Sequence, residues 1–242
     1  MDLKEAIRVA RPTVVQVRNA EQVLGTGFFV SDDGIVATAR HVVEGQDSLL
    51  VGLAQPDTEN MRANFTLVGS NVLAQSERHD LALLRMRANP FQGQVSSGMV
   101  IDDEAIPLLF GVTQLDSARP EDGEPIAISG YPLSNPVLVT TSGGVASAWS
   151  YDMAEVAIPG RPEGFKMPDI ADLLLADVQA NPGNSGGPVY RVADAAVLGV
   201  CIEVQGSPVW GDGGPLPVAS NAGLTVARPA RYVVELMTTA GV

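Results

Sequence analysis

The chain has 242 residues, of which 45% are hydrophobic, and this is enough to bury two modest cores. Its 15 basic and 28 acidic side chains give a net charge of −13, which disfavours nucleic acid and anionic membranes as partners. A single cysteine excludes an internal disulfide, and residues 1–6 have neither the basic nor the apolar region of a signal peptide. We therefore favour the cytoplasm, with a domain of a larger or secreted protein as the alternative.

The first half of the sequence predicts a helix followed by short strands. Residues 2–10 have the pattern of a helical lead-in. Apolar and β-branched runs between turn residues then predict strands at 12–17, 27–30, 35–39, 48–53, 65–68 and 81–86. Short strands at this spacing are typical of all-β proteins.

A polar, turn-rich segment at 111–125 is the predicted linker to the second half. Further apolar runs predict strands at 126–129, 137–141, 144–150, 173–178, 188–190, 196–203 and 224–227. Residues 229–237 predict an amphipathic helix after them. The sequence has no internal repeat, low-complexity tract or apolar stretch of membrane-spanning length.

Residues 181–188, Asn-Pro-Gly-Asn-Ser-Gly-Gly-Pro, place one serine among three glycines. Glycine adopts backbone conformations that are closed to other residues. The amides of Gly183 and Ser185 can therefore converge on one point beside the Ser185 hydroxyl, where they would stabilise an oxyanion. A serine hydroxyl alone is a poor nucleophile, so the segment predicts a catalytic site only if the chain also supplies a base and an acid.

The order of the histidines decides between two hydrolase architectures. Residues 183–187 also fit the G-x-S-x-G pattern of α/β-hydrolases, in which the order is serine, acid, histidine. Both histidines, His41 and His79, precede Ser185. This excludes the α/β-hydrolase pattern and leaves the order histidine, aspartate, serine, which the double-barrel serine proteases use.

His41 is the predicted general base. It follows an apolar run at 34–39 that predicts a buried strand ending in a short turn, so a polar ring lies at the end of a strand. A surface histidine in a loop is the alternative. His79 follows Ser-Glu-Arg in a polar turn and is predicted to be an exposed bystander.

Asp80 is the predicted acid, because it precedes a strongly apolar strand and lies between the histidine and the serine in the chain. Its alternative role is that of a turn or capping residue. The rival acids, Asp102, Asp103 and Asp116, lie in polar or linker-like segments.

Four segments together resemble the trypsin-like (chymotrypsin-fold) serine proteases, and among them the HtrA/Deg type. They are residues 25–30 leading to 38–43, 80–84, 140–148 and 181–188. The resemblance implies an all-β fold of two six-stranded antiparallel β-barrels with a short C-terminal helix. The first barrel would lie in residues 1–113, and residues 114–242 would hold the second barrel and the helix.

The resemblance also assigns roles. It implies His41 as general base, Asp80 as orienting acid and Ser185 as nucleophile, with the amides of Gly183 and Ser185 as the oxyanion hole. The first barrel would supply His41 and Asp80 to a cleft, and the second barrel would supply Ser185. The expected substrate is a protein or peptide, and no cofactor or metal is expected.

Asn184 departs from the digestive branch of these proteases, where an aspartate pairs with a new N-terminus made by cleavage. An asparagine cannot form that ion pair, and no Ile-Val-Gly-Gly-like activation sequence lies near the start. We therefore expect an enzyme that needs no zymogen cleavage and whose activity depends on loop ordering, with an activating protein partner as one route to that order. HtrA-type proteins usually continue into a PDZ domain, and we expect none within this sequence.

The resemblance implies that the base of the primary specificity pocket lies near Gln179 and Ala180, with its far wall on the strand that carries Ile202 and Val204. Val204 stands where a glycine opens a deep pocket in trypsin-like digestive enzymes, and no acid lies at the base. We expect a shallow, apolar pocket that prefers a small or medium aliphatic residue before the cut bond. A one-residue slip in the strand would reverse this assignment.

Neighbouring residues receive smaller roles. Ile202 occupies the place where related enzymes often keep a hydroxyl that supports the acid, so Asp80 is expected to have one hydrogen bond fewer. Glu203 is predicted to lie on a solvated face. Cys201 is predicted to be a small buried side chain rather than a nucleophile.

Three functions fit these features. The leading one is an endopeptidase that acts through an acyl-enzyme. The second is a binding or scaffolding module that keeps the fold but holds the oxyanion loop collapsed, and the third is an esterase without peptidase activity. Two glycine- and proline-rich segments, 151–168 and 206–214, are expected to flank the pocket, either as activation loops or as ordinary surface irregularity.

Overall fold

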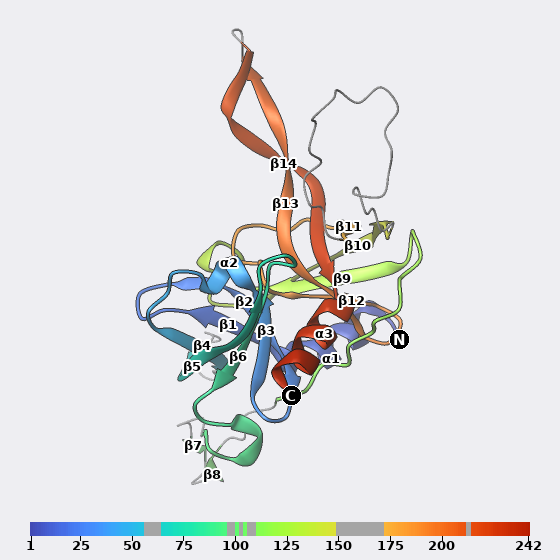
Figure 1. Ribbon diagram of the computed structural model, residues 1–242. Coiled ribbons are helices and arrows are strands. Elements are labelled where there is room, and N and C mark those ends of the chain that lie inside the picture. The colour runs from blue at the N-terminus through green and yellow to red at the C-terminus, as the bar shows by residue number, and fades with distance from the viewer. Residues whose placement is uncertain (56–63, 96–99, 102–103, 106–109, 149–171, 212–213) are drawn as a thin grey trace.

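Two closed antiparallel barrels of six strands each form the body of the molecule (Figure 1). This architecture comes from a computed structural model that describes residues 1–242 except 56–63, 96–99, 102–103, 106–109, 149–171 and 212–213. It confirms the all-β double barrel with a short C-terminal helix. Within the described residues, no helix combines the length and the apolar character that a membrane crossing needs.

The first barrel has the strand order β1-β2-β3-β6-β5-β4. Its strands are β1 (Val14–Arg18), β2 (Val23–Ser31), β3 (Ile35–Ala39), β4 (Leu49–Gln55), β5 (Asn64–Ser76) and β6 (Leu81–Met86). Strands β3 and β6 have the predicted bounds. Strand β5 is much longer than the predicted 65–68. Its first part pairs with β4, and its more polar second part pairs with β6.

The second barrel has the strand order β10-β11-β14-β13-β12-β9. Its strands are β9 (Pro125–Gly130), β10 (Val139–Ser147), β11 (Leu174–Asp177), β12 (Pro188–Arg191), β13 (Val197–Gly211) and β14 (Gly214–Pro229). The two predicted strands at 137–141 and 144–150 are one strand, β10. They join because Ser142 and Gly143 remain paired with β9.

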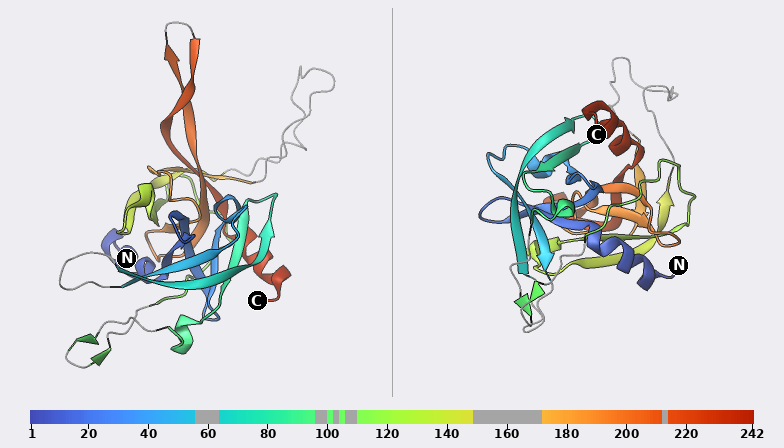
Figure 2. Two further views of the ribbon diagram at one scale, coloured as in Figure 1. Left: turned by 90° about the vertical axis from the view of Figure 1, so that its left-hand side faces the viewer. Right: turned by 90° about the horizontal axis from the view of Figure 1, so that it is seen from below.

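Strands β13 and β14 continue as a long hairpin that projects away from both barrels (Figure 1, Figure 2). Pairs such as Ser207 with Ser220 and Trp210 with Pro215 extend the ladder toward the tip. The segment 206–214 is therefore largely paired, rather than the irregular loop predicted from its glycines. The other predicted loop, 151–168, lies outside the described residues.

Short elements complete the chain. They are α1 (Leu3–Ala10), η1 (Arg11–Thr13), α2 (Arg40–Val43), η2 (Pro90–Gln92), β7 (Val100–Ile101), β8 (Glu104–Ala105), η3 (Pro132–Ser134) and α3 (Arg231–Ala240). Helix α1 begins with a capping box, in which the Asp2 carboxylate accepts from Glu5 N (2.8 Å) and the Glu5 carboxylate accepts from Asp2 N (2.9 Å). The predicted helices at the two ends of the sequence are thus present.

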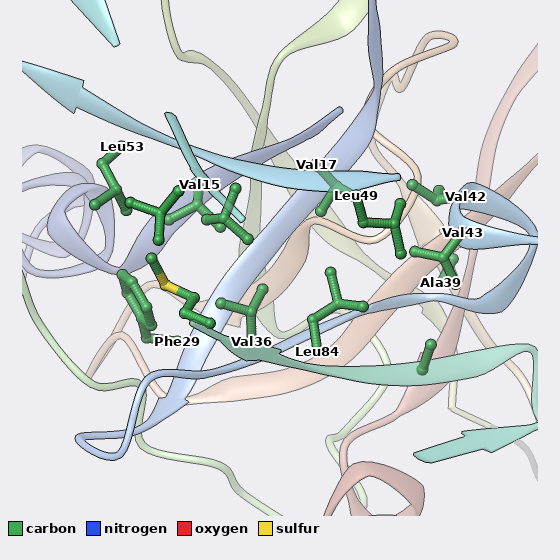
Figure 3. Packing of buried hydrophobic residues seen from close by; sticks show 14 of the residues in the cluster. Val15, Val17, Phe29, Val36, Ala39, Val42, Val43, Leu49, Leu53 and Leu84 are labelled. Carbon is green, nitrogen blue, oxygen red and sulfur yellow. The ribbon is translucent and has the colours of Figure 1, made fainter. Parts of the chain in front are cut away.

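Three apolar clusters hold these elements together. One fills the first barrel, and α2 contributes Val42 and Val43 to it (Figure 3). Another fills the second barrel. The third lies between the barrels, where Ala6 of α1 and Leu236 of α3 join apolar side chains from both. The interface between the barrels is therefore an apolar core, and burial of this kind is the main favourable term in folding.

One arginine of the second barrel pairs with two acidic residues of the linker and with a third acid nearby. Arg191 on β12 pairs with Asp116 (2.6 Å), Glu124 (2.6 Å) and Asp194 (2.8 Å). Asp116 also accepts a bond from the amide of Ala118, and these interactions lower its pKa, the backbone bond first. The domain boundary at 113/114 stays a prediction.

Candidate active site

The His41 side chain is carried by the four-residue helix α2, which begins directly after β3. Val42 and Val43 on the same helix are buried in the first-barrel cluster. Anchoring of these neighbours fixes the backbone of the turn and leaves the imidazole partly exposed, with 42% of the side chain accessible.

Asp80 meets His41 through two hydrogen bonds. The Asp80 Oδ2 atom lies 2.6 Å from His41 Nδ1, and Oδ1 accepts from the His41 backbone N–H at 3.0 Å. The Asp80 carbonyl also accepts from Arg40 N at 3.0 Å. A carboxylate can only accept, so the proton of this ring bond belongs to Nδ1 and leaves Nε2 unprotonated in the neutral ring.

The segment 181–188 that carries Ser185, which we call the serine loop, is bound to both barrels by main-chain hydrogen bonds. The Ser185 carbonyl accepts from Thr26 N of β2 at 2.9 Å, which ties the loop to the first barrel. Gly186 N donates to Cys201 O at 2.7 Å, and Cys201 N donates to Gly187 O at 2.9 Å, which ties it to β13. Ser185 is therefore held between the two barrels. The first barrel also brings His41 and Asp80 together.

Two glycines of this loop have positive φ, +102° at Gly183 and +85° at Gly186. A Cβ at Gly186 would lie 2.1 Å from Thr26 O and 2.2 Å from Thr38 Oγ1, and one at Gly183 would lie 2.5 Å from Tyr131 O. Both positions therefore need glycine for its conformation and for its lack of a side chain.

Thr26 links the serine loop to the segment after β9. Its hydroxyl donates to Gly183 O at 2.7 Å and accepts from Tyr131 N at 3.0 Å. Its carbonyl accepts from Thr38 Oγ1 at 2.7 Å. Sequence reasoning gave Thr26 no role, although its setting between two glycines lies inside a segment that carries the family resemblance.

The turn at 181–184, before Ser185, is also held by the segment that follows β9. Asn184 N donates to Asn181 O at 3.0 Å and closes the turn, and Leu133 N donates to Pro182 O at 2.7 Å. Leu133 is exposed and has φ +55°, which is uncommon for a residue with a side chain. Asn184 is 4% exposed, and its Oδ1 has no hydrogen-bond partner among the described residues.

The other candidates for base and acid have different environments. His79 stacks on Tyr232 with ring centroids 3.7 Å apart, and burial lowers its pKa, helped by the nearby charges of Arg228 and Arg78. It is partly buried by this stack rather than fully exposed as predicted. Asp116 pairs with Arg191 in the linker. The remaining candidates, Asp102 and Asp103, lie outside the described residues.

The predicted pocket residues lie in different environments. Gln179 is exposed, and its carbonyl accepts from Thr141 Oγ1 at 2.8 Å. Ala180 is fully buried in the second-barrel cluster. Ile202 packs with the first-barrel cluster, whereas Val204 is half-buried against the second-barrel cluster.

A bulge interrupts the alternation of buried and exposed side chains along the strand that carries Ile202 and Val204. The register of β13 against β14 shifts between Cys201 and Glu203. A bulge inserts a residue into one strand and re-aims its side chains. Glu203 is exposed, and Cys201 is 1% exposed in the second-barrel core, where burial raises its pKa to about 12. Both environments are those predicted from the sequence.

Comparison with known proteins adds a family and two relatives to this geometry. The sequence model of the "Trypsin-like peptidase domain" family matches residues 25–200, a range that includes His41, Asp80 and Ser185. A "Probable periplasmic serine endoprotease DegP-like" of Halomonas elongata is 32% identical over 177 residues, which are 73% of this chain. The "Putative serine protease HhoB" of Synechocystis is 29% identical over 76% of this chain.

The chain spans only 28% of the first of these relatives and 38% of the second. The name of the Halomonas protein does not support the cytoplasmic location predicted from the sequence.

Solved structures share the fold. A crystal structure of the serine endoprotease from Yersinia pestis superposes with a TM-score of 0.61 at 19% identity, covering 99% of this chain and 66% of that one. The HtrA-type protease AlgW with a decapeptide gives a TM-score of 0.64 at 17% identity, covering 99% of this chain and 67% of that one. At such identities the likeness establishes the fold alone.

Proposed function

Because the chain belongs to the trypsin-like peptidase domain family, we propose that it is a serine endopeptidase that cuts protein or peptide substrates, with Ser185 as its nucleophile. The observation that carries the proposal is the 2.6 Å contact between His41 Nδ1 and Asp80 Oδ2, made by two residues 39 positions apart. A bond of this length and polarity holds the imidazole in the tautomer that a general base needs.

The proposed reaction proceeds in two halves. Ser185 Oγ attacks the carbonyl carbon of the scissile bond while His41 Nε2 takes its proton, and the resulting imidazolium gives that proton to the leaving amine. The product is an acyl ester on Ser185 and a free amine. Water then attacks the ester with His41 again as base, which releases the acid and restores the serine hydroxyl. Throughout both halves, Asp80 accepts the hydrogen bond from His41 Nδ1–H and stabilises the imidazolium.

The proposed oxyanion hole consists of the amides of Gly183 and Ser185. The Pro182 carbonyl accepts from Leu133 N, and the described chain has no cis peptide bond. In a trans peptide the carbonyl and the following N–H point in opposite directions, so the Gly183 N–H is directed away from Leu133. This orientation supports an open hole and favours the peptidase over the module with a collapsed oxyanion loop.

We further propose that no zymogen cleavage is needed. Asn184 is buried and uncharged, and main-chain bonds to Asn181, Thr26 and Cys201 hold the loop in place of an ion pair with a new N-terminus. An activating protein partner would then act on loop order, as the resemblance to HtrA-type proteases suggests.

For the substrate, we propose a small or medium aliphatic residue before the cut bond. The half-buried Val204 supports an apolar lining, and Gln179 supplies no charge. Ala180, proposed for the base of the pocket, is buried in the apolar second-barrel cluster. Ile202 would contribute from the side of the first barrel. Preferential cleavage after arginine or lysine in a peptide library would contradict this part of the proposal.

Labelling with a fluorophosphonate probe tests the proposed function. We expect one probe molecule per chain, attached to Ser185, and none on Ser185→Ala. Correctly folded protein that takes up no probe, with or without candidate protein partners, would instead favour the binding module. Labelled protein that turns over esters but cuts no peptide would indicate the esterase.

A further inference from the structure

A buried arginine of the second barrel contacts the loop of the first barrel that carries Asp80, residues 77–80, which we call the acid loop. Arg228 on β14 is 7% exposed, and its Nε donates to the His79 carbonyl at 2.8 Å. Its Nη1 donates to the Asp172 carbonyl at 2.6 Å. Arginine is almost never this buried unless its donors are satisfied, so these two contacts fix the guanidinium in one place.

The bond to His79 acts on the peptide that precedes Asp80. The carbonyl of this peptide accepts from Arg228, and its N–H donates to Glu77 O at 3.3 Å. The peptide unit is planar, so bonds at both of its edges fix its rotation. That rotation sets φ of Asp80, because φ is the torsion of the bond between the Asp80 nitrogen and its Cα.

Asp80 needs such support because its φ is +53°. This left-handed region is uncommon for residues with a side chain, although aspartate tolerates it better than most. From this conformation the carbonyl of Asp80 accepts from Arg40 N and the carboxylate accepts twice from His41. A rotated peptide would therefore move the carboxylate away from the imidazole.

Charge adds to the geometry. The negative charge of Asp80 acts on Arg228 and opposes the lowering of its pKa by burial. Among the described residues, both hydrogen bonds to the Asp80 carboxylate come from His41, and Ile202 brings no hydroxyl. The second barrel thus supports the acid through its backbone and its charge.

The residues around Arg228 also contact one another. The Asp172 carboxylate accepts from the Tyr232 hydroxyl at 2.9 Å and pairs with Arg231. The Tyr232 ring stacks on His79. Arg228 of β14, Asp172 before β11, Tyr232 of α3 and His79 of the acid loop therefore form a closed ring of contacts.

We infer that Arg228 is a positioning residue for Asp80, which clamps the His79–Asp80 peptide and so keeps the carboxylate aimed at His41. The inference rests on the proposed function, because it gives Asp80 the role of the acid. Arg228 touches neither the nucleophile nor the base in the described contacts, and it acts only through the acid loop.

Arg228→Met tests this role, with Arg231→Met as the matched control. Arg231 pairs with the same Asp172 but makes no described bond to the acid loop. We expect Arg228→Met to lower kcat on a peptide substrate by on the order of 10–100-fold with KM changed by less than about twofold. Arg231→Met should retain kcat. An unchanged kcat in a folded Arg228→Met variant would overturn the inference.

A double-variant cycle shows whether Arg228 acts through the acid. In an Asp80→Asn background, Arg228→Met should slow fluorophosphonate labelling by no more than about twofold, since the group it positions is already lost. If Arg228→Met slowed labelling in that background as much as it does in the parent protein, the inference would be overturned. Where the methionine variant does not fold, Arg228→Gln, which is too short to span both carbonyls, is measured in the same cycle and judged by the same outcomes.

The single variants separate the inference from the proposed function. If Ser185→Ala and Asp80→Asn lose activity but Arg228→Met does not, only the role of Arg228 is wrong. If Asp80→Asn alone is as active as the parent protein, the role of Asp80 as the acid is wrong and the inference is overturned with it. If Ser185→Ala is as active as the parent protein, the proposed function is itself wrong.

Discussion

The loop that carries Ser185 and the loop that carries Asp80 both use left-handed backbone, but they obtain it differently. In the serine loop, Gly183 and Gly186 take φ of +102° and +85°, and glycine adopts these angles without strain. In the acid loop the residue at φ +53° is Asp80 itself, which carries a side chain and needs that side chain for its proposed role.

The difference lies in where the support comes from. The serine loop is shaped by its own glycines and by main-chain bonds to β2 and β13. The acid loop depends on the side chain of Arg228, which is 149 positions away in the chain. The serine loop thus obtains its left-handed backbone from glycines in its own sequence, whereas the left-handed residue of the acid loop is supported by a side chain from the other barrel.

The largest effect is expected from Gly186→Ala. The new Cβ would overlap Thr26 O and Thr38 Oγ1 at a positive φ, and strain plus overpacking should destabilise the fold by about 2–6 kcal/mol. Urea denaturation measures this loss. Gly45→Ala is the control, because Gly45 has φ +70° with open space around it, and it should cost only about 1–2 kcal/mol. Equal losses would mean that close packing of the serine loop matters little.

A smaller effect is expected from Thr26→Val, which keeps the shape but removes the hydroxyl between Gly183 O and Tyr131 N. Leaving these groups unpaired should cost about 1–3 kcal/mol. Probe labelling of Ser185 should slow by on the order of 10-fold, equivalent to about 1.4 kcal/mol in the barrier.

Thr13→Val is the matched control for this change, because Thr13 is buried and its hydroxyl donates to Ala10 O rather than to the serine loop. It should lower stability without slowing the labelling. If both variants label at the parent rate, the Thr26 hydroxyl does not help to shape the loop.

The smallest effect concerns His79, whose pKa is lowered in the folded protein chiefly by burial. The unfolded chain then binds the proton more readily than the folded one, so stability should fall as pH drops below about 6.5 and stay constant above it. His79→Phe keeps a ring on Tyr232 and should flatten this slope. Unfolding midpoints between pH 7.5 and pH 5, roughly the range of histidine titration, measure it. Identical slopes would assign the proton uptake to another group.

The sequence predicted the fold class, most strands and the residues His41 and Asp80 that the structure brings together. These features were accessible because strand periodicity, glycine spacing and residue order are local or linear properties. Strand β5 was underestimated because its second part is polar, and the projecting hairpin was missed because glycines and prolines interrupt its pattern.

Two supporting residues could not be found in this way. Thr26 stands in a recognisable segment, but its contacts with Gly183 and Tyr131 arise only when the barrels meet. Arg228 follows an apolar strand and looks like an ordinary surface cation at its end. Its burial and its bond to His79 depend on the packing of β14 against the first barrel.

Cleavage of a peptide library, read by mass spectrometry for the parent chain and Ser185→Ala, tests the proposed peptidase activity directly. We expect internal cuts after small or medium aliphatic residues. Ser185→Ala should lower their rate by on the order of 10⁶-fold, as expected when the nucleophile of a triad is removed. Cuts at the same positions and rates in the Ser185→Ala variant would contradict it.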